Sequence, residues 1–239
     1  MIPRIIHYCW FGKNEMSQLV QDCLASWHHY MPTWQYKLWN EDSFDIQSSP
    51  SYVKEAYKME KYAFVSDYVR LWALEKFGGL YMDVDFEVYK PFDDLLIHSA
   101  FAGYEGSKRK PIMMGVIASE PRGIWVSEMI STYNTRHFIL TDGSLDLTPN
   151  TSYFSDLLEA KGFIPDGKEK DFGELHVFPV EYFCPVLTTG ENVHSNKTYC
   201  EHKGLHSWSG NGGWKGKLLG LLTPRWKTRL IKFKRKIIG

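Results

Sequence analysis

Residues 78–85 read Gly78-Gly79-Leu80-Tyr81-Met82-Asp83-Val84-Asp85, two glycines followed by strand-like sequence that carries two aspartates one residue apart. Apolar and polar side chains alternate from Leu80 to Tyr89, so an extended backbone would place the two carboxylates on one face, about 6 to 7 Å apart. Two negative charges at that spacing repel each other, and Mg²⁺ or Mn²⁺ relieves the repulsion by accepting carboxylate oxygens. The pattern predicts a divalent-cation site, and the alternative is an edge strand with a solvated acidic face.

The sequence upstream favours the cation site. Residues 52–77 have the pattern of a helix, and Gly78 and Gly79 stand where helices commonly end. Asp67 and Arg70 are three residues apart and therefore share one face of this helix. On a surface such a pair contributes only tenths of a kcal/mol, but the residues around it are largely apolar. We therefore expect a buried Asp67 and Arg70 that bind a polar ligand beside the aspartates.

Two segments together resemble the DXD sugar-binding region of family 32 glycosyltransferases, namely residues 61–71, Lys-Tyr-Ala-Phe-Val-Ser-Asp-Tyr-Val-Arg-Leu, and residues 78–85. The shared features are Asp-x-x-Arg, the eleven-residue step from Arg70 to Tyr81, and Tyr-x-Asp-x-Asp. That family includes capsular-polysaccharide and lipopolysaccharide sugar transferases and fungal α-mannosyltransferases, and it is related to the large clostridial toxin glucosyltransferases. The resemblance extends to residues 2–12, which are similar to the family's first strand, and to a later Ser-Trp pair at 207–208.

The resemblance implies a role for each matching residue toward a nucleotide-sugar donor, with a UDP-sugar as the expected one. Trp10 would stack on the uracil, with a core tryptophan as the alternative, and Asn40 would contact the nucleotide. Asp67 and Arg70 would hold hydroxyls of the donor sugar. Tyr81 and Asp83 would lie close to the nucleotide and the sugar, and Asp85 would bind the metal directly, with Asp83 reaching it through water or holding a sugar hydroxyl.

The rest of the metal site has to come from a distant part of the chain. Residues 200–208 contain three side chains that can donate to a cation, Glu201, His202 and His206. Members of the family have a histidine five residues before a Ser-Trp pair, and His202 occupies that position. His206 departs from the usual pattern, so all three candidates stay open, as does a loop histidine with no ligand role. By the same resemblance, Ser207 and Trp208 would bind the nucleotide-sugar donor, and Trp208 would cover the diphosphate when a loop closes.

The formal net charge of zero conceals an uneven distribution. Residues 214–239 hold nine Lys and Arg and no acid, which leaves 19 basic and 28 acidic residues in the preceding 213. A helix in this tail would align Trp226, Leu230, Phe233 and Ile237 in one apolar stripe, with basic side chains on the other face. This pattern predicts an interfacial helix on an anionic membrane surface. The alternatives are a helix packed on its own domain and, least favoured, binding to nucleic acid.

The coarse order of elements is strand 4–10, helix 19–31, strand 36–39, helix 52–77 and strand 80–89, followed by strands near 101–104 and 112–118 and helices near 124–133 and 153–160. Such alternation is typical of an α/β fold with a mostly parallel sheet and helices on both faces. With the resemblance, we expect a GT-A-like, nucleotide-binding domain over residues 1–213 and a separate tail over 214–239.

We therefore expect a metal-dependent glycosyltransferase that moves a sugar from a nucleotide-diphosphate donor to a hydroxyl of a glycan or lipid-linked acceptor in surface polysaccharide synthesis, with retention implied by the resemblance. No signal-peptide pattern or long apolar run is present, so we expect a cytoplasmic protein, peripheral on the inner face of the membrane. Two rivals remain. A sugar nucleotidyltransferase should carry a Gly-rich phosphate loop, of which residues 9–14 are a poor version; a non-enzymatic membrane scaffold would use the tail alone.

Overall fold

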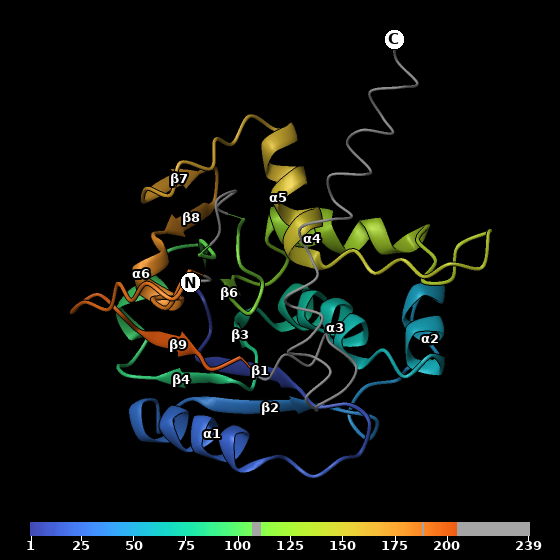
Figure 1. Cartoon of the computed structure of the whole chain (residues 1–239), viewed down its shortest axis with the longest axis horizontal. Coiled ribbons are helices and arrows are strands. Elements are labelled where there is room, and N and C mark those ends of the chain that lie inside the picture. Colours follow the sequence, from blue (N-terminus) through green and yellow to red (C-terminus); the bar gives the residue numbers. More distant parts are fainter. Residues whose placement is uncertain (107–110, 188, 205–239) are drawn as a thin grey trace. The chain divides into compact units, whose positions relative to one another are not determined.

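A seven-stranded sheet organises residues 1–204, which the computed structural model describes apart from 107–110 and 188 (Figure 1). Its strands, in spatial order, are β2 (Gln35–Trp39), β1 (Ile5–Cys9), β3 (Gly79–Met82), β6 (Val116–Ser119), β5 (Ala100–Gly103), β8 (Leu175–Phe178) and β7 (Lys170–Phe172). The pairings make β1, β2, β3, β5 and β8 run in one direction, with β6 and β7 opposed to them. The predicted mostly parallel sheet is confirmed.

Helices cover both faces of this sheet. They are α1 (Gln18–Tyr30), α2 (Ser51–Lys58), α3 (Tyr62–Phe77), α4 (Ile124–Ser131), α5 (Asn150–Ala160) and α6 (Val180–Phe183), with 3₁₀ turns η1 (Asp93–Ile97) and η2 (Thr132–Asn134). Among the residues described, no helix has the length and apolarity needed to cross a membrane. The predicted tail over 214–239 and the boundary near 213 lie outside the described residues.

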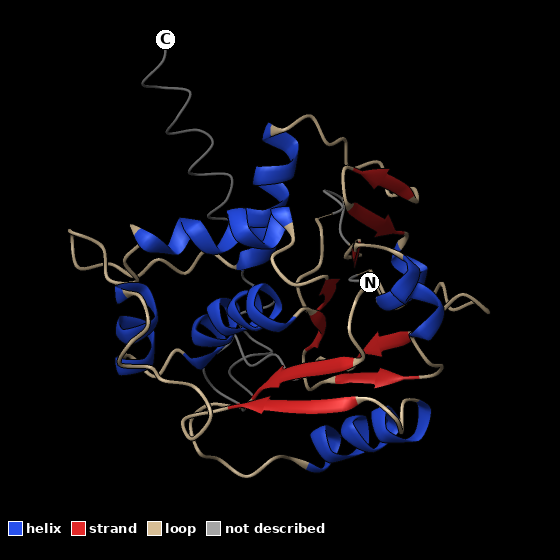
Figure 2. Cartoon of the chain, turned by 180° about the vertical axis from the view of Figure 1, so that it is seen from behind, coloured by secondary structure: helices blue, strands red, loops and turns tan. Residues whose placement is uncertain are grey.

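Two buried clusters show how the strand pattern places the helices. Successive strand residues point to opposite faces, so Tyr81 packs into one cluster while Leu80 and Met82 pack into the other. The first cluster contains side chains of α2, α3, α4 and α5. The second contains side chains of α1, α6 and β4 (Phe86–Val88). Seen from behind in Figure 2, strands of the sheet lie between α1 and α3.

Three predicted elements are wrong in their extent. The strand expected near 112–118 begins only at Val116. The helix expected over 52–77 is interrupted between Lys58 and Tyr62, where Glu60 adopts a positive φ of 56°. The strand expected over 80–89 ends at Met82, and residues 83–85 form the turn that leads into β4. The two aspartates therefore do not share one face of a strand.

The strand breaks because β4 finds partners away from the main sheet. Trp27 of α1 donates its indole N–H to the carbonyl of Phe86 at 2.7 Å, and Ser26 accepts the N–H of Val88 at 2.9 Å. On its other side β4 pairs antiparallel with β9 (Cys200–His202), with Phe86 opposite His202. These partners are far apart in the sequence, so the local alternation of residues 80–89 gave no sign of them.

Candidate active site

The carboxyl edge of the parallel strands gathers the residues predicted to bind a ligand. In the register of β1, β2 and β3, Cys9 lies opposite Trp39 and His7 lies opposite Tyr81. The residues that follow these strands, Trp10, Asn40 and Asp83, therefore lie along one edge of the sheet. Ligands of open α/β sheets bind at this edge.

Arg70 joins two of the predicted carboxylates. Its Nη2 lies 3.1 Å from Oδ1 of Asp67 and 3.3 Å from Oδ1 of Asp83, and its Nη1 donates to the carbonyl of Met114 at 2.7 Å. Only 3% of Arg70 and 1% of Asp67 are exposed. The pair is therefore part of a buried charge network, and the alternative of a surface ion pair is wrong.

Tyr81 fixes the Asp83 carboxylate from the strand side. Its hydroxyl donates to Oδ1 of Asp83 at 2.7 Å, and the Arg70 guanidinium lies over its ring, 4.7 Å from the centroid. Oδ1 of Asp83 thus has two partners, the Tyr81 hydroxyl in a hydrogen bond and Arg70 in an ion pair. These contacts orient the partly buried carboxylate, whose side chain is 29% exposed, before any ligand arrives.

Gly115 leaves the space that Asp83 needs. Its carbonyl accepts the backbone N–H of Asp83 at 2.8 Å. A Cβ atom at this position would lie 2.9 Å from Oδ2 of Asp83 and 2.8 Å from the Phe86 ring. Only glycine therefore allows β6 to begin so close to the turn.

Burial sets the protonation behaviour of this cluster. Desolvation raises the pKa of Asp67 to about 6, although Arg70 acts in the opposite direction. Desolvation also raises the pKa of Asp83, again against the charge of Arg70. Burial disfavours the charged form of Arg70, but Asp83, Tyr81 and Asp67 outweigh it and raise the pKa of the guanidinium. Arg70 is consequently the permanent cation of the cluster.

Asn150 supports Asp67 from behind, and the sequence analysis missed it. Its backbone N–H donates to Oδ2 of Asp67 at 3.2 Å, and its side-chain Nδ2 donates to the Asp67 carbonyl at 2.6 Å. Tyr133 donates its hydroxyl to Oδ1 of Asn150 at 2.6 Å. Pro149 just before a helical pattern was the available signal for a helix start here, but nothing local connects that start to Asp67.

Asp85 meets His202 across the small two-stranded sheet. Nε2 of His202 lies 3.0 Å from Oδ2 of Asp85, and the imidazole stacks on Phe86 with ring centroids 4.7 Å apart. The Asp85 carbonyl also accepts the N–H of Lys203 at 2.8 Å. Burial lowers the pKa of His202, but the hydrogen bond and charge of Asp85 prevail and raise it. Of the two candidates that the structure describes for the distant part of the metal site, Glu201 and His202, His202 is the one whose side chain contacts Asp85.

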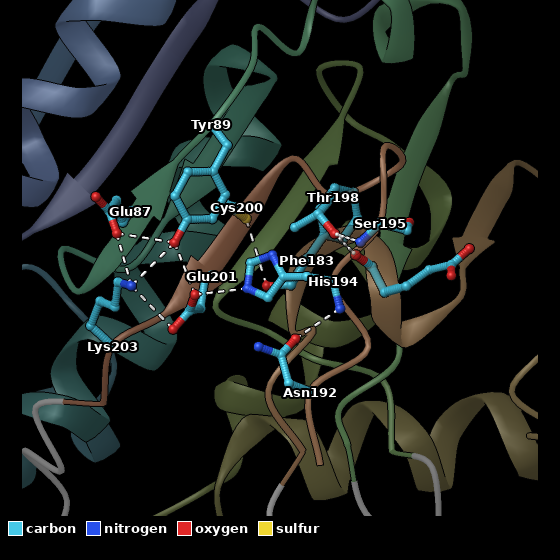
Figure 3. Close-up of polar contacts among 11 residues, drawn as sticks. Glu87, Tyr89, Phe183, Asn192, His194, Ser195, Thr198, Cys200, Glu201 and Lys203 are labelled. Carbon is cyan, nitrogen blue, oxygen red and sulfur yellow. Dashed lines mark hydrogen bonds and ion pairs between the residues drawn. The ribbon is translucent and has the colours of Figure 1, made fainter. Parts of the chain in front are cut away.

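Glu201 contacts a different set of residues, as Figure 3 shows. Its carboxylate accepts from Tyr89 at 2.9 Å and lies 2.9 Å from Nε2 of His194 and 3.1 Å from Nζ of Lys203. Lys203 also pairs with Glu87 at 2.8 Å. This network ties β4 to β9 and so holds His202 in register with Asp85. His206 lies outside the described residues.

The predicted nucleotide contacts have local partners. Trp10 is half-buried and donates its indole N–H to the Asn14 carbonyl at 2.7 Å. Oδ1 of Asn40 accepts from the backbone N–H groups of Asp42 and Ser43, which caps the turn after β2. Their contacts with a nucleotide stay predictions. Ser207 and Trp208 lie outside the described residues.

Glu105 is a further carboxylate that the sequence analysis missed. It follows β5 by two residues, at the same edge of the sheet, and its N–H donates to the Pro111 carbonyl at 2.8 Å. Burial raises the pKa of Glu105. The charges of His202 and Arg70 act to lower this pKa, and the charge of Asp83 acts to raise it. A glutamate just after a predicted strand was the only signal in the sequence.

Comparison with known proteins also indicates a glycosyltransferase sugar-binding region. Residues 17–102 match the family described as a glycosyltransferase sugar-binding region containing a DXD motif. Glucan organizing enzyme 1 of Cryptococcus neoformans var. grubii is 31% identical over 85 residues, 32% of this chain and 23% of that protein. Inositol phosphoceramide mannosyltransferase 1 of Schizosaccharomyces pombe is 32% identical over 110 residues, 42% of this chain and 33% of that protein. The chain spans at most about a third of the length of these two curated relatives.

Among solved structures, the PaToxG glycosyltransferase aligns with a TM-score of 0.50 at 18% identity, over 67% of this chain and 70% of that chain. At this identity the likeness concerns the fold alone. It agrees with the mixed sheet and the helices on both of its faces. Residues 17–102 thus match a glycosyltransferase sugar-binding region that contains a DXD motif, and the fold is GT-A-like.

Proposed function

We propose that this chain transfers a sugar from a nucleotide-diphosphate donor, a UDP-sugar, to a hydroxyl of a glycan or lipid-linked acceptor in surface polysaccharide synthesis, with retention of the anomeric configuration. One observation carries the proposal. The Arg70 network includes Asp83, and the contact with His202 is made by Asp85, two residues further along the chain. Side chains from distant segments are therefore brought together at residues 83–85, at the edge where sheets of this type bind ligands. The DXD family match and the curated relative named as a mannosyltransferase support the same chemistry.

The Arg70 network is suited to hold the donor sugar. Sugar hydroxyls donate to carboxylates and accept from guanidinium N–H groups, and both partners are present in Asp67, Arg70 and Asp83. Hydrogen bonds from Tyr81 and Asn150 fix two of these carboxylates in advance. A preformed network of this kind orients the sugar without reorganising during the reaction.

Asp85 and His202 fit a divalent cation. A carboxylate oxygen and an imidazole nitrogen 3.0 Å apart can bind one ion, and the imidazole favours Mn²⁺ over Mg²⁺, which prefers oxygen ligands. We assign Asp83 to the sugar and ribose, because its Oδ1 already accepts a hydrogen bond from Tyr81 and pairs with Arg70. A bound cation would offset the charge that develops on the departing diphosphate.

The sugar nucleotidyltransferase alternative is not favoured by the loop after β1. That reaction calls for free backbone N–H groups in a Gly-rich loop that cradles phosphate. Here the N–H of Gly12 donates to Oε1 of Glu41 at 2.8 Å. A carboxylate in that position repels phosphate, so the loop favours the transferase.

Thermal unfolding with Mn²⁺ and UDP tests the proposed function. We expect the two together to raise Tm well beyond the sum of their separate effects, because a cation that also contacts the diphosphate of UDP would make each ligand bind the folded state more tightly in the presence of the other. His202→Ala should weaken the Mn²⁺ dependence, whereas His29→Ala, which changes an exposed histidine of α1, should leave it unchanged. Equal stabilisation of both variants would contradict the role of His202. Hydrolysis of a panel of nucleotide sugars without acceptor would then identify the donor.

Acidification should remove activity before it removes the fold. The pKa of Asp67 is about 6, so protonation below that pH removes the negative charge opposite Arg70. We expect kcat/KM for the donor to fall as the pH drops through about 6, and Asp67→Asn to show low activity without this pH limb. The pKa of an aspartate in the unfolded chain is about 3.9. Between this pH and about 6, the folded chain holds more protons at Asp67 than the unfolded chain does. The contribution of Asp67 to the free energy of unfolding therefore decreases as the pH rises through this range. Circular dichroism should show an intact fold while activity is lost. Activity unaffected by pH down to about 5 would contradict this role of Asp67.

The basic residues of the segment 214–239 support a further part of the proposal, attachment to the inner face of a membrane. Each Lys or Arg near an anionic surface contributes about 1 kcal/mol. Sedimentation of the whole chain with anionic vesicles, but not with zwitterionic ones, is the expected result. Equal sedimentation with both, or with neither, would contradict it.

A further inference from the structure

Three side chains outside the active site converge at the β7–β8 side of the sheet. They are His98, which follows η1, Asp171 of β7 and His176 of β8. One potential ligand atom from each lies within 4.8 Å of the other two. Nδ1 of His176 lies 2.7 Å from Oδ1 of Asp171, and the two imidazole rings stack with centroids 4.0 Å apart.

This cluster is separate from the Asp85 site. Asp171 lies directly opposite His176 in the β7–β8 pairing, and His176 lies opposite Phe101 of β5. His98 precedes β5, so the cluster lies toward the amino ends of β5 and β8. Asp83 and Glu105 follow the carboxyl ends of their strands. The cluster therefore cannot share a ligand with the Asp85–His202 contact.

We propose that His98, Asp171 and His176 bind a divalent transition-metal ion, with Zn²⁺ as the best match. Two imidazoles and one carboxylate are a donor set that zinc uses in proteins, with water in the fourth position. The same set is poorly suited to Mg²⁺ or Ca²⁺, which prefer oxygen ligands. This proposal does not rest on the proposed transferase activity.

The surroundings of His176 support a ligand role. Its Nε2 lies 3.2 Å from Oε1 of Glu169, while Nδ1 faces Asp171. Glu169 in turn accepts a hydrogen bond from the Tyr182 hydroxyl at 3.4 Å. A carboxylate that accepts the second ring N–H is the usual support of a metal-binding histidine, since it fixes the tautomer and the ring orientation. Glu169 is thus a positioning residue for His176.

The bound ion would connect three segments that are otherwise held by few strand pairings. β7 is a three-residue strand at the edge of the sheet and pairs only with β8 among the described residues. The Asp171 side chain is 78% exposed, so apolar packing does not hold it. An ion shared with His98 would tie this edge to the start of β5. We infer a structural role for it, because none of the residues assigned to the donor sugar or to the active-site cation takes part.

Zinc titration of the untagged, chelator-stripped whole chain tests this site. Calorimetry should be carried out in an Asp85→Ala background, which removes the ligand proposed for the active-site cation. We expect one Zn²⁺ to bind in this background, and His98→Ala and Asp171→Asn each to weaken binding by about ten-fold or more. Both changes are made at partly or largely exposed side chains, so the variants should fold. His29→Ala is the matched control, and it should bind Zn²⁺ like the parent.

Two further measurements separate coordination from a general loss of structure. Co²⁺ in place of Zn²⁺ should give visible absorption bands in the parent and in His29→Ala, but not in His98→Ala. Glu169→Gln should weaken Zn²⁺ binding by about ten-fold and retain the Co²⁺ spectrum, as expected of a positioning residue. The proposal is overturned if the parent binds no Zn²⁺, or if His98→Ala and Asp171→Asn bind it as tightly as His29→Ala.

Discussion

Asp85→Ala should abolish metal-dependent hydrolysis and transfer of the nucleotide sugar while leaving the fold intact. The side chain contributes the carboxylate that meets His202, whereas the fold uses the Asp85 carbonyl, which accepts from Lys203 and survives the substitution. Loss of a cation that stabilises the leaving diphosphate removes several kcal/mol of transition-state stabilisation, which corresponds to a fall in kcat of about a thousand-fold or more. Steady-state hydrolysis of the donor in the presence of Mn²⁺ measures the effect.

The matched control for this variant is Asp22→Ala, which removes an exposed carboxylate of α1. It should retain both activity and the response to Mn²⁺. Asp85→Ala should keep the parent's circular dichroism, and calorimetry should show that its Mn²⁺ binding is lost. Wild-type activity that persists undiminished after exhaustive chelation would contradict the assignment of Asp85.

Short-range patterns predicted the part of the site that lies on one helix. Asp67 and Arg70 are three residues apart, and the apolar residues around them indicated burial, so their adjacency followed from helical periodicity alone. The glycines at 78 and 79 marked the end of the same helix, and the structure has that end at Phe77. Within a single element, spacing and polarity are sufficient because the backbone geometry is regular.

The turn at residues 83–85 shows where such patterns fail. Alternation predicted one strand, but β4 leaves the sheet for partners on α1 and β9, and no property of residues 80–89 encodes that choice. His202 was selected by its resemblance to a family position, since the residues alone left Glu201 and His206 equally open. Asn150 and Glu105 were missed for the same reason, because their contacts with the site depend on chain crossings far along the sequence.

Arg70→Ala should cause the largest loss of stability among substitutions in the site. It leaves the buried carboxylate of Asp67 without its cation, and it removes the guanidinium from Asp83 and from the carbonyl of Met114. Removing one partner of a buried ion pair typically costs about 3 to 5 kcal/mol, because the remaining charge stays desolvated. Urea unfolding, with the m-value checked for two-state behaviour, measures the free energy of unfolding.

Arg4→Ala provides the comparison for that measurement. Arg4 also pairs with an aspartate, its Nε lying 2.7 Å from Oδ1 of Asp93, but 62% of its side chain is exposed. Water and salt screen such a pair, so its loss should cost no more than about 1 kcal/mol. If Arg70→Ala were as mild as Arg4→Ala, the guanidinium would not be what holds the two carboxylates in place. Combining Arg70→Ala with Asp67→Asn should restore part of the lost stability, since the double variant no longer buries an uncompensated charge at that position.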